Sequence, residues 1–429
     1  MIEPLTPTSC DVLVIGAGPA GSACAQALAR GGLQVLLVDQ HEFPRDKVCG
    51  DGLIPDSHAA LKRLGVYDEV AALATPVAHV RCVGPRGGHI DVPGTMSVLP
   101  RKTLDHILVR AAERAGARLL TPLRFEAPLL DEGQRVVGAR FRRLGISGVA
   151  DVSGVAGVAG EAGEPGPGLH EISARWVVLA TGAVPQGLTA AGLCERQSPS
   201  GVALRGYVKH EGLVGQITQL QIVWHRRLRG GYGWIFPAPG ALFNIGTGMT
   251  GSHRAESGTG RMRSLNLREM FDAFCEVYPP ARELMQGGQL QGEIKGAPLR
   301  CSLRGARWSR PGLLVAGDAA GTTYAFSGEG IGKAMESGLL AAEALLHERE
   351  APDAAVQQRH EAGLLALKPQ FDLYDTASRI NEHPWLTDLV IWRAQRSPRL
   401  QRRLAGVLDE TQNPGRLFSW RGVTKLMFE

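Results

Sequence analysis

The sequence predicts a mixed α/β fold in which a parallel-sheet unit is interrupted by an antiparallel sheet and followed by a helical C-terminal region. Short apolar runs typical of strands buried on both faces occur at residues 11–15, 34–38, 174–183 and 312–316. Alternating strand patterns fill residues 201–248, and residues 364–429 have mostly helical or irregular patterns. A chain of 429 residues with 44% hydrophobic content is long enough for two or three domains.

The first strand leads into a glycine-rich turn. Gly16, Gly18 and Gly21 have the spacing G-x-G-x-x-G, and small residues with helical spacing follow them. The first glycine permits the tight turn, the second lets the backbone approach a pyrophosphate, and the third allows close packing of helix and strand. The helix N-terminus offers free N–H groups to phosphates. Asp39 ends the second strand, where its carboxylate is placed to bind ribose hydroxyls.

This order of strand, glycine turn, helix, strand and acid predicts a Rossmann-like dinucleotide site. Asp39 in place of a basic residue disfavours NADP and leaves NAD and FAD open. A second motif, Gly-Asp-Ala-Ala at residues 317–320, follows a buried strand and precedes a helix expected to begin near residues 328–332. Asp318 is expected to bind ribityl or ribose hydroxyls, and the alternative is that it only caps this helix. Because reduced flavin is anionic, a helix N-terminus there suits a flavin better than nicotinamide.

The chain divides into three kinds of segment. The dinucleotide-binding domain is expected at residues 1–75, 101–185 and 296–345. The inserted antiparallel-sheet substrate domain is expected at residues 76–100 and 186–295, with the helical region at residues 346–429. Residues 145–171 are low in complexity and rich in small residues, which predicts a flexible insertion because such a composition builds no core.

Charge and cysteine content restrict the class of protein. The formal net charge of +5 is mild for this length, and no sustained Lys/Arg block indicates nucleic acid binding. The seven scattered cysteines have no CxxC or metal-ligand spacing, so we expect neither a disulfide framework nor a metal site. We see no secretory leader and no apolar run of membrane-spanning length. These features predict a soluble, reduced, cytoplasmic protein.

Several motifs together resemble the p-hydroxybenzoate hydroxylase superfamily of FAD-dependent oxidoreductases. They are the fingerprint at residues 16–21, Arg101 within LPRKTLD, and GDAAG at residues 317–321. The stretches FPRDKVCGDGL, RGYV, GYGWIFP and GDAAGTTYAFSGEGIGKAMESGLLAAE most closely resemble the geranylgeranyl reductase and flavin-dependent halogenase-like branch. The resemblance runs from about residue 11 to residue 343 and implies a Rossmann-like FAD-binding domain with an inserted antiparallel-sheet substrate domain.

The resemblance implies FAD as the cofactor and a set of residues around it. The implied cofactor-binding residues are Gly16, Gly18, Pro19, Ala20, Gly21, Asp39, Gln40, Arg45, Gly50, Arg101, Thr181, Gly182, Gly317, Asp318, Gly328, Gly330 and Ile331. The implied catalytic residues on the substrate side of the flavin are Lys47, Cys49, Gly328 and Glu329. The alternative for Lys47 is a solvated loop charge. For Cys49 it is a small space-filling residue, because a thiol is reactive only where its pKa is lowered.

Departures from the family pattern bear on the reaction. Residues 179–193 lack the Asp-Gly motif that serves both FAD and NADPH in many hydroxylases, so we expect an external flavin reductase or electron donor as a partner. GYGWIFP does not match the Trp-x-Trp-x-Ile-Pro motif of halogenases, which disfavours halogenation. The FSGEGI segment lacks the Pro that commonly precedes it in reductases, which alters the expected substrate wall.

Two reactions remain open. In the first, favoured by a small margin, reduced FAD and oxygen give a C4a-hydroperoxide that hydroxylates a bulky or aromatic substrate. Relatives of this branch that hydroxylate a tryptophan of another protein during quinone-cofactor maturation extend this reaction to a protein substrate. In the second, reduced FAD delivers hydride to an isoprenoid or lipid double bond, and an acid such as Cys49 protonates the neighbouring carbon. A halogenase and a non-catalytic flavoprotein are the less favoured alternatives.

The C-terminal stretch at residues 391–408 spaces its arginines so that a helix would carry a basic face. Together with residues 145–171, such a face would border a cleft open to a protein substrate. The alternatives are a solvated face that covers the FAD domain and a peripheral contact with a membrane, which would suit a lipid reductase. The arginines are Arg393, Arg396, Arg399, Arg402 and Arg403.

Overall fold

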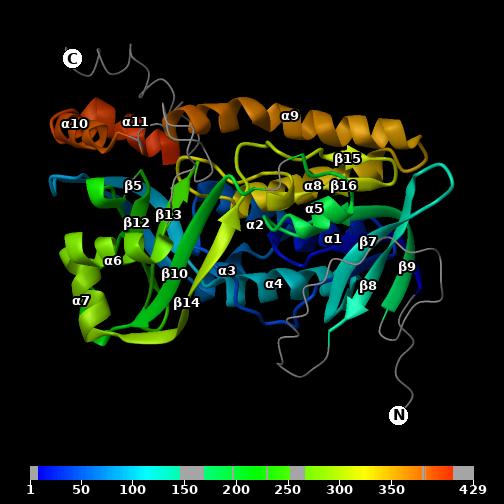
Figure 1. Ribbon diagram of the computed structural model, residues 1–429, viewed down its shortest axis with the longest axis horizontal. Helices are drawn as coiled ribbons and strands as arrows, with labels where there is room; N and C mark the ends of the chain where they lie inside the picture. The colour runs from blue at the N-terminus through cyan, green and yellow to red at the C-terminus, as the bar shows by residue number, and fades with distance from the viewer. Residues whose placement is uncertain are drawn as a thin grey trace.

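The computed structural model describes residues 8–144, 169–195, 198–228, 230–251, 266–378, 381 and 383–408. The expected flexible insertion at residues 145–171 lies outside this part of the chain, except for its last three residues, which begin a strand. Within the described residues the strands form two eight-stranded sheets, which lie at opposite sides of the molecule and are bridged by helices along one edge (Figure 1).

The first sheet forms the dinucleotide-binding half. Its strands are β1 (Ser9–Ile15), β2 (Val35–Val38), β6 (Arg118–Leu120), β7 (Leu123–Leu130), β8 (Val136–Arg143), β9 (Leu169–Leu179), β15 (Ser309–Arg310) and β16 (Leu313–Val315). The strands β16, β9, β1, β2 and β6 are parallel neighbours in that order, while β8 pairs antiparallel with β9 and β7 pairs antiparallel with β8. The central strands are buried, in agreement with their apolar sequences.

Six of the described helices belong to this half and pack on the sheet or on one another. They are α1 (Pro19–Arg30), α2 (Pro55–Leu64), α3 (Tyr67–Leu73), α4 (Arg101–Arg114), α5 (Gln186–Ala190) and α8 (Ile331–His347). The helix α1 contacts both α4 and α8. A Cβ atom at Gly338 would lie 2.1 Å from the carbonyl oxygen of Ala20, so only glycine allows α8 to approach α1 this closely.

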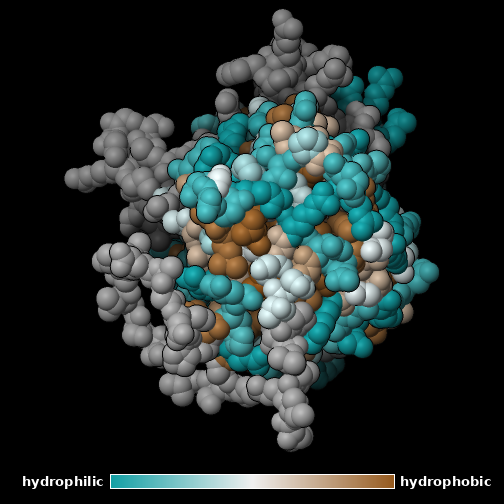
Figure 2. Space-filling view, turned by 90° about the vertical axis from the view of Figure 1, so that its right-hand side faces the viewer, coloured by the Kyte–Doolittle hydropathy of each residue, from teal (hydrophilic) through white to brown (hydrophobic). Residues whose placement is uncertain are grey.

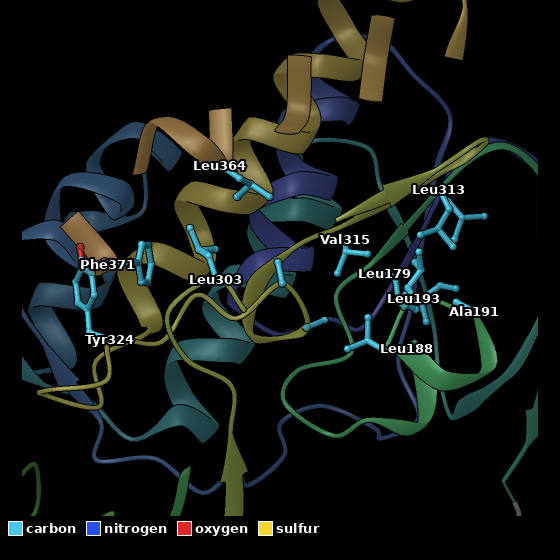
Figure 3. Packing of buried hydrophobic residues seen from close by; sticks show 14 of the residues in the cluster. Leu179, Leu188, Ala191, Leu193, Leu303, Leu313, Val315, Tyr324, Leu364 and Phe371 are labelled. Carbon is cyan, nitrogen blue, oxygen red and sulfur yellow. The ribbon is translucent and has the colours of Figure 1, made fainter. Parts of the chain in front are cut away.

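The C-terminal helices connect the two halves. They are α9 (Asp353–Ala377), α10 (Pro384–Ala394) and α11 (Pro398–Leu408). The helix α9 packs on α8, whereas α10 and α11 contact the second sheet (Figure 1). Beneath α9, side chains of the first sheet, the α5 region and α9 meet in one core (Figure 3). The members labelled in Figure 3 are Leu179, Leu188, Ala191, Leu193, Leu303, Leu313, Val315, Tyr324, Leu364 and Phe371.

The second sheet is mainly antiparallel and forms the other half. Its strands are β3 (Gly52–Leu53), β4 (Thr75–Val83), β5 (His89–Val98), β10 (Gly201–Lys209), β11 (Leu220–Val223), β12 (Tyr232–Ala238), β13 (Leu242–Thr250) and β14 (Gln289–Leu299). Their order is β14-β10-β13-β12-β11-β4-β5-β3, and only the contact of β11 with β4 is parallel within the described strands. The helices α6 (Leu267–Val277) and α7 (Pro279–Gly287) lie at this half, and α6 contacts β10 and β13.

The predicted mixed α/β fold with an inserted antiparallel sheet and a helical C-terminal region is confirmed. The structure differs from the expected segments at three points. The helix α5 contacts β7 of the first sheet although it lies within residues 186–295. Strand β3 joins the second sheet although it lies within residues 1–75, and β14 continues to Leu299, past residue 295. A two-residue strand has no period that a sequence could reveal. No helix among the described residues is both long and apolar enough to cross a membrane.

Candidate active site

A cavity of about 960 Å³ extends from the carboxyl ends of β1, β2 and β9 to the inner surface of the second sheet. In sheets of this kind, ligands bind outside the carboxyl ends of the strands. Every site residue predicted from the sequence lines this cavity except Gly21. Residues that lie some three hundred positions apart in the sequence are therefore brought together around one space.

The glycine turn shapes the first end of the cavity. Gly16 has φ +101°, and a Cβ atom there would lie 2.3 Å from the carbonyl oxygen of Ala180. A Cβ atom at Gly21 would lie 1.8 Å from the carbonyl oxygen of Gly16, so Gly21 serves the packing of α1 against β1 and not the cavity wall. Gly18 is the N-cap of α1 and provides no side-chain cap. The helix N-terminus thus keeps N–H groups for a phosphate.

Asp39 ties the end of β2 to this turn. One carboxylate oxygen accepts a hydrogen bond from the backbone N–H of Ala17 at 2.8 Å, and the other accepts from His41 at 2.9 Å. Each carboxylate oxygen has two acceptor sites, so both retain capacity for a ribose hydroxyl. The backbone contacts fix the carboxylate in the cavity wall beside the glycine turn.

Arg101 and Asp105, four positions apart on α4, form a buried ion pair. The Nε and Nη2 atoms of Arg101 donate to Asp105 at 2.6 and 2.8 Å, and Asp105 is fully buried. The Nη1 atom of Arg45 lies 3.1 Å from the same carboxylate. A Cβ atom at Gly18 would lie 3.7 Å from Nη2 of Arg45 and 3.8 Å from Nη2 of Arg101. Two guanidinium groups thus share one carboxylate beside the N-terminus of α1.

Three polar atoms in this wall are buried without a hydrogen-bond partner among the described residues. They are Nε and Nη1 of Arg45 and Oγ1 of Thr181. Buried polar groups are almost always paired, so these atoms indicate a polar ligand in the cavity. The positive φ of Gly16 and the open N-terminus of α1 lie in the same wall. This end therefore has the donors and the room that a diphosphate needs.

The second motif approaches the cavity from the start of α8. Asp318 accepts a hydrogen bond from Oγ1 of Thr323 at 2.8 Å, and burial raises the pKa of Asp318. Asp318 does not cap α8, since the N-cap of that helix is Gly330 and has no side-chain hydrogen bond. Gly328 has φ +72°, and a Cβ atom there would lie 2.4 Å from the hydroxyl oxygen of Tyr232. The loop before α8 is thereby held directly against the second sheet.

Lys47 and Cys49 lie in the cavity wall between the two motifs. Lys47 is half-buried, and its ammonium group makes no hydrogen bond or ion pair with a described residue. Burial lowers the pKa of Lys47, and the neighbouring Arg101 lowers it further. Burial raises the pKa of the Cys49 thiol, while Arg101 acts in the opposite direction. At neutral pH Cys49 is therefore a protonated thiol.

A buried polar network that the sequence analysis missed supports this wall. Asp51 has φ +65°, is fully buried, and accepts hydrogen bonds from the hydroxyl of Tyr207 and from Nδ2 of Asn244, the latter at 2.7 Å. Burial raises the pKa of Asp51 to about 6. Asn244 also donates to the carbonyl oxygen of Cys49 at 2.7 Å. The network therefore fixes the backbone that presents Cys49.

Part of this network carried a signal in the sequence. Asp51 directly follows Cys49 and Gly50 within CGDGL, and Tyr207 lies within RGYV, both stretches that carry the family resemblance. Asn244 lies on β13 in a stretch with no motif, and only the pairing of β13 with β12 and β10 brings it to the site. Its Oδ1 atom accepts a hydrogen bond from Nε1 of Trp234 at 2.8 Å.

Aromatic side chains line the second end of the cavity. Trp224 stacks on Phe326 with ring centroids 6.4 Å apart and 15° between the ring planes. Tyr232 lies between Trp224 and Trp234, at 6.4 and 6.2 Å from their centroids. The helices α10 and α11 add further, mostly apolar residues, which are Thr387, Val390, Ile391, Leu404 and Val407. This end offers apolar surface to a hydrocarbon or an aromatic ring.

Comparison with known proteins identifies the family. Residues 9–147 match the FAD binding domain family. The chain is 32% identical over 368 residues to the menaquinone reductase of Mycobacterium tuberculosis, and the match covers 79% of this chain and 76% of that protein. The chain belongs to the superfamily of FAD-dependent oxidoreductases. Its cofactor is FAD.

Other relatives of this FAD-dependent oxidoreductase agree. The digeranylgeranylglycerophospholipid reductase 1 of Methanopyrus kandleri is 29% identical over 80% of this chain and 82% of that protein. A geranylgeranyl bacteriochlorophyll reductase-like structure from Thermoplasma acidophilum superposes with a TM-score of 0.67 at 22% identity, covering 99% of this chain and 97% of that one. The predicted superfamily and cofactor are thus confirmed.

Proposed function

We propose that this protein is an FAD-dependent reductase of carbon–carbon double bonds in an isoprenoid or lipid substrate. The observation that carries the proposal is the continuity of the dinucleotide end with a long, aromatic-walled chamber in one cavity. Relatives named menaquinone reductase and digeranylgeranylglycerophospholipid reductase support this substrate class. An apolar chamber of this kind suits a hydrocarbon chain better than a small charged substrate.

The chain's own residues fit the parts of FAD. The N-terminus of α1, with Arg45 and Arg101, would hold the diphosphate, and Asp39 would hold the ribose of the ADP half. Asp318 would bind ribityl hydroxyls. When bound and reduced, FAD supplies a hydride equivalent. The ammonium group of Lys47, which lies in the electrostatic field of Asp318, would stabilise negative charge in this part of the cavity.

A proton must accompany the hydride if a double bond is to become a single bond. We assign the proton to Sγ of Cys49, because burial raises the pKa of this thiol and keeps it protonated at neutral pH. The substrate carbon takes the thiol proton, and water reprotonates the thiolate afterwards. Asn244 and Asp51 hold the Cys49 backbone in place, and the aromatic wall excludes water from the reacting carbons.

The electrons are proposed to come from an external donor. The absence of the Asp-Gly motif from residues 179–193 supports a partner reductase or another electron carrier. A partner can be tested by mixing the FAD-loaded protein with NADPH alone under nitrogen and following flavin absorbance. Slow reduction is expected, and fast reduction would contradict the partner proposal.

Hydroxylation, which the sequence analysis favoured by a small margin, stays a prediction. The matched relatives are reductases at least as much as monooxygenases, so the preference for monooxygenation is unconfirmed. The same holds for a tryptophan of a partner protein as substrate. The aromatic end of the cavity has room for an aromatic ring as well as for a hydrocarbon chain, and the experiment must therefore separate the two reactions.

The test is a single-turnover reaction with two gas phases. The FAD-loaded protein is reduced with dithionite and mixed with a detergent-solubilised menaquinone or geranylgeranyl lipid, under nitrogen or with oxygen admitted. Mass spectrometry should show two added hydrogen atoms per reduced double bond under nitrogen. A product that forms only with oxygen and carries an added oxygen atom would overturn the proposal in favour of hydroxylation.

Cysteine variants test the proton donor. Cys49→Ala should slow product formation at least about tenfold, in keeping with the loss of a positioned general acid. Cys275→Ala is the matched control, because Cys275 is also partly buried but lies on α6 outside the cavity lining. Equal rates in the two variants would remove Cys49 from the mechanism.

A further inference from the structure

The helices α10 and α11 have an inner and an outer face. The inner face lines the apolar end of the cavity through residues such as Val390 and Leu404. On the outer face, Trp385 is 54% exposed and Trp392 is 48% exposed. These tryptophans are seven positions apart, so they lie on the same side of α10. Large aromatic side chains are rarely left this exposed without a partner.

Basic side chains accompany the exposed tryptophans. Within residues 384–408 the sequence has five arginines and one acidic residue, Asp388, which is already within 3.9 Å of Arg86. None of the five arginines forms an ion pair with a described residue. The guanidinium group of Arg396 lies 4.8 Å from the ring centroid of Trp392, which places charge and indole together. The five are Arg393, Arg396, Arg399, Arg402 and Arg403.

The opposite end of the molecule differs. It carries β7, β8 and β9, and Figure 2 shows hydrophilic residues on it around a hydrophobic patch near the middle of the view. Some of the exposed arginines there are paired: Arg124 and Arg142 share Glu126, at 3.1 and 3.2 Å, whereas Arg143 on β8 forms no ion pair with a described residue. Unpaired arginines beside exposed tryptophans therefore distinguish the α10–α11 end.

We propose that the outer face of α10 and α11 docks this protein on the surface of a bilayer that contains anionic phospholipid. Arginine attracts anionic headgroups, and tryptophan inserts at the boundary between headgroups and acyl chains. The same two helices line the cavity, so docking would bring its apolar end to the membrane. The proposal deepens the proposed function, and it rests on that function only for the statement that the substrate is a lipid.

The experiment is co-sedimentation of the FAD-loaded full chain with vesicles of phosphatidylcholine, with and without phosphatidylglycerol. We expect binding that requires phosphatidylglycerol and weakens at high salt. The triple variant R399Q/R402Q/R403Q should lower the partition coefficient about one-hundredfold, since each basic residue near the surface contributes about 1 kcal/mol. The matched control is K102Q/R143Q/R349Q, which removes the same charge from exposed positions without ion pairs elsewhere.

Two measurements test the tryptophans: the depth to which they enter the bilayer, and the binding that is lost when they are replaced. Brominated phospholipid should quench the tryptophan fluorescence of the bound protein, and W385A/W392A should abolish most of that quenching and lower binding about tenfold. Leu365→Ala, at an equally exposed apolar residue on α9, should leave binding unchanged. Circular dichroism checks that each variant is folded.

Three outcomes would overturn the proposal. They are absence of binding to phosphatidylglycerol vesicles, equal losses in the triple variant and its control, and a dimer in sedimentation velocity that W385A/W392A dissociates. The last result would assign the face to a second copy of the chain. Failure of the proposed reductase reaction is separate, because that reaction is measured in detergent and vesicle binding needs no substrate.

Discussion

The two ends of the cavity are built in opposite ways. The dinucleotide end consists of glycines, backbone N–H groups and buried charges, with Arg45 and Arg101 sharing the carboxylate of Asp105. The other end consists of aromatic rings, with Trp224 and Phe326 as its stacked pair. The first end offers strong, directional interactions to one fixed group. The second end offers an apolar surface that fits the substrate and excludes water.

The two ends therefore hold their ligands by different kinds of contact. A cofactor that stays bound is held by a rigid set of donors whose removal disrupts the fold or the binding outright. A substrate that must enter and leave is held by apolar contact, which tolerates variation in chain length. Changes at the first end should therefore affect FAD affinity or stability, whereas changes at the second should affect the substrate alone.

The largest expected effect follows from Gly16→Ala. The added Cβ atom would lie 2.3 Å from the carbonyl oxygen of Ala180 at a φ of +101°, so the turn must shift. We expect FAD affinity to fall about one-hundredfold, measured by titration of FAD into the cofactor-free protein. Gly32→Ala is the control, because Gly32 has φ +81° with nothing within 4 Å of its Cβ position. Equal affinities in both variants would show that close approach at Gly16 is unimportant.

Asp105→Asn tests the shared carboxylate. The substitution leaves the guanidinium groups of Arg101 and Arg45 without their buried counter-charge. We expect the free energy of unfolding to fall by about 3–5 kcal/mol, measured by urea denaturation. Glu69→Gln, which breaks the exposed pair with Arg114, should cost less than about 1 kcal/mol. If Asp105→Asn lowers the free energy of unfolding only slightly, Arg45 and Arg101 repel each other little when FAD is bound.

Asp51, which lies between the two ends of the cavity, makes the free energy of unfolding depend on pH. The pKa of Asp51 is about 3.8 in the unfolded chain and about 6 in the folded protein, because burial raises it. Below pH 3.8 the folded and the unfolded chain both hold the proton. As the pH rises towards 6 only the unfolded chain releases it, so the contribution of Asp51 to stability falls by about 3 kcal/mol and then stays constant.

Asp51→Asn should remove this dependence. The unfolding free energy of the variant minus that of the wild type should rise by about 2.5 kcal/mol between pH 4 and pH 7, whatever constant loss the missing hydrogen bonds cause. Asp46→Asn is a control in which the stability difference should change with pH in the opposite direction. Burial alone would raise the pKa of Asp46, but the ion pair with Arg205 lowers it overall. Parallel stability curves for wild type and Asp51→Asn would contradict an unusual titration at this site.

The sequence predicted the two ends unequally, for a physical reason. The dinucleotide end rests on contiguous motifs in which each residue type has a backbone role, so Gly16, Asp39 and Asp318 could be predicted from spacing, and all three line the cavity. The aromatic end is assembled from β11, β12, the loop before α8, and α10. No local pattern shows that Trp224 and Phe326, about one hundred residues apart, would stack. The positive φ of Asp51 likewise depends on tertiary contacts.

The smallest effect should follow from Trp224→Phe, at the aromatic end of the cavity. The variant keeps a ring against Phe326 and loses the hydrogen bond from Nε1 to Oδ1 of Asn381, 2.8 Å long. A lost hydrogen bond of this kind is worth about 1 kcal/mol, so KM for a detergent-solubilised isoprenoid substrate should rise about fivefold. FAD affinity should not change. Trp392→Phe, on the outer face of α10, should leave both constants unaltered. A fall in FAD affinity on Trp224→Phe would show that the two ends are not independent.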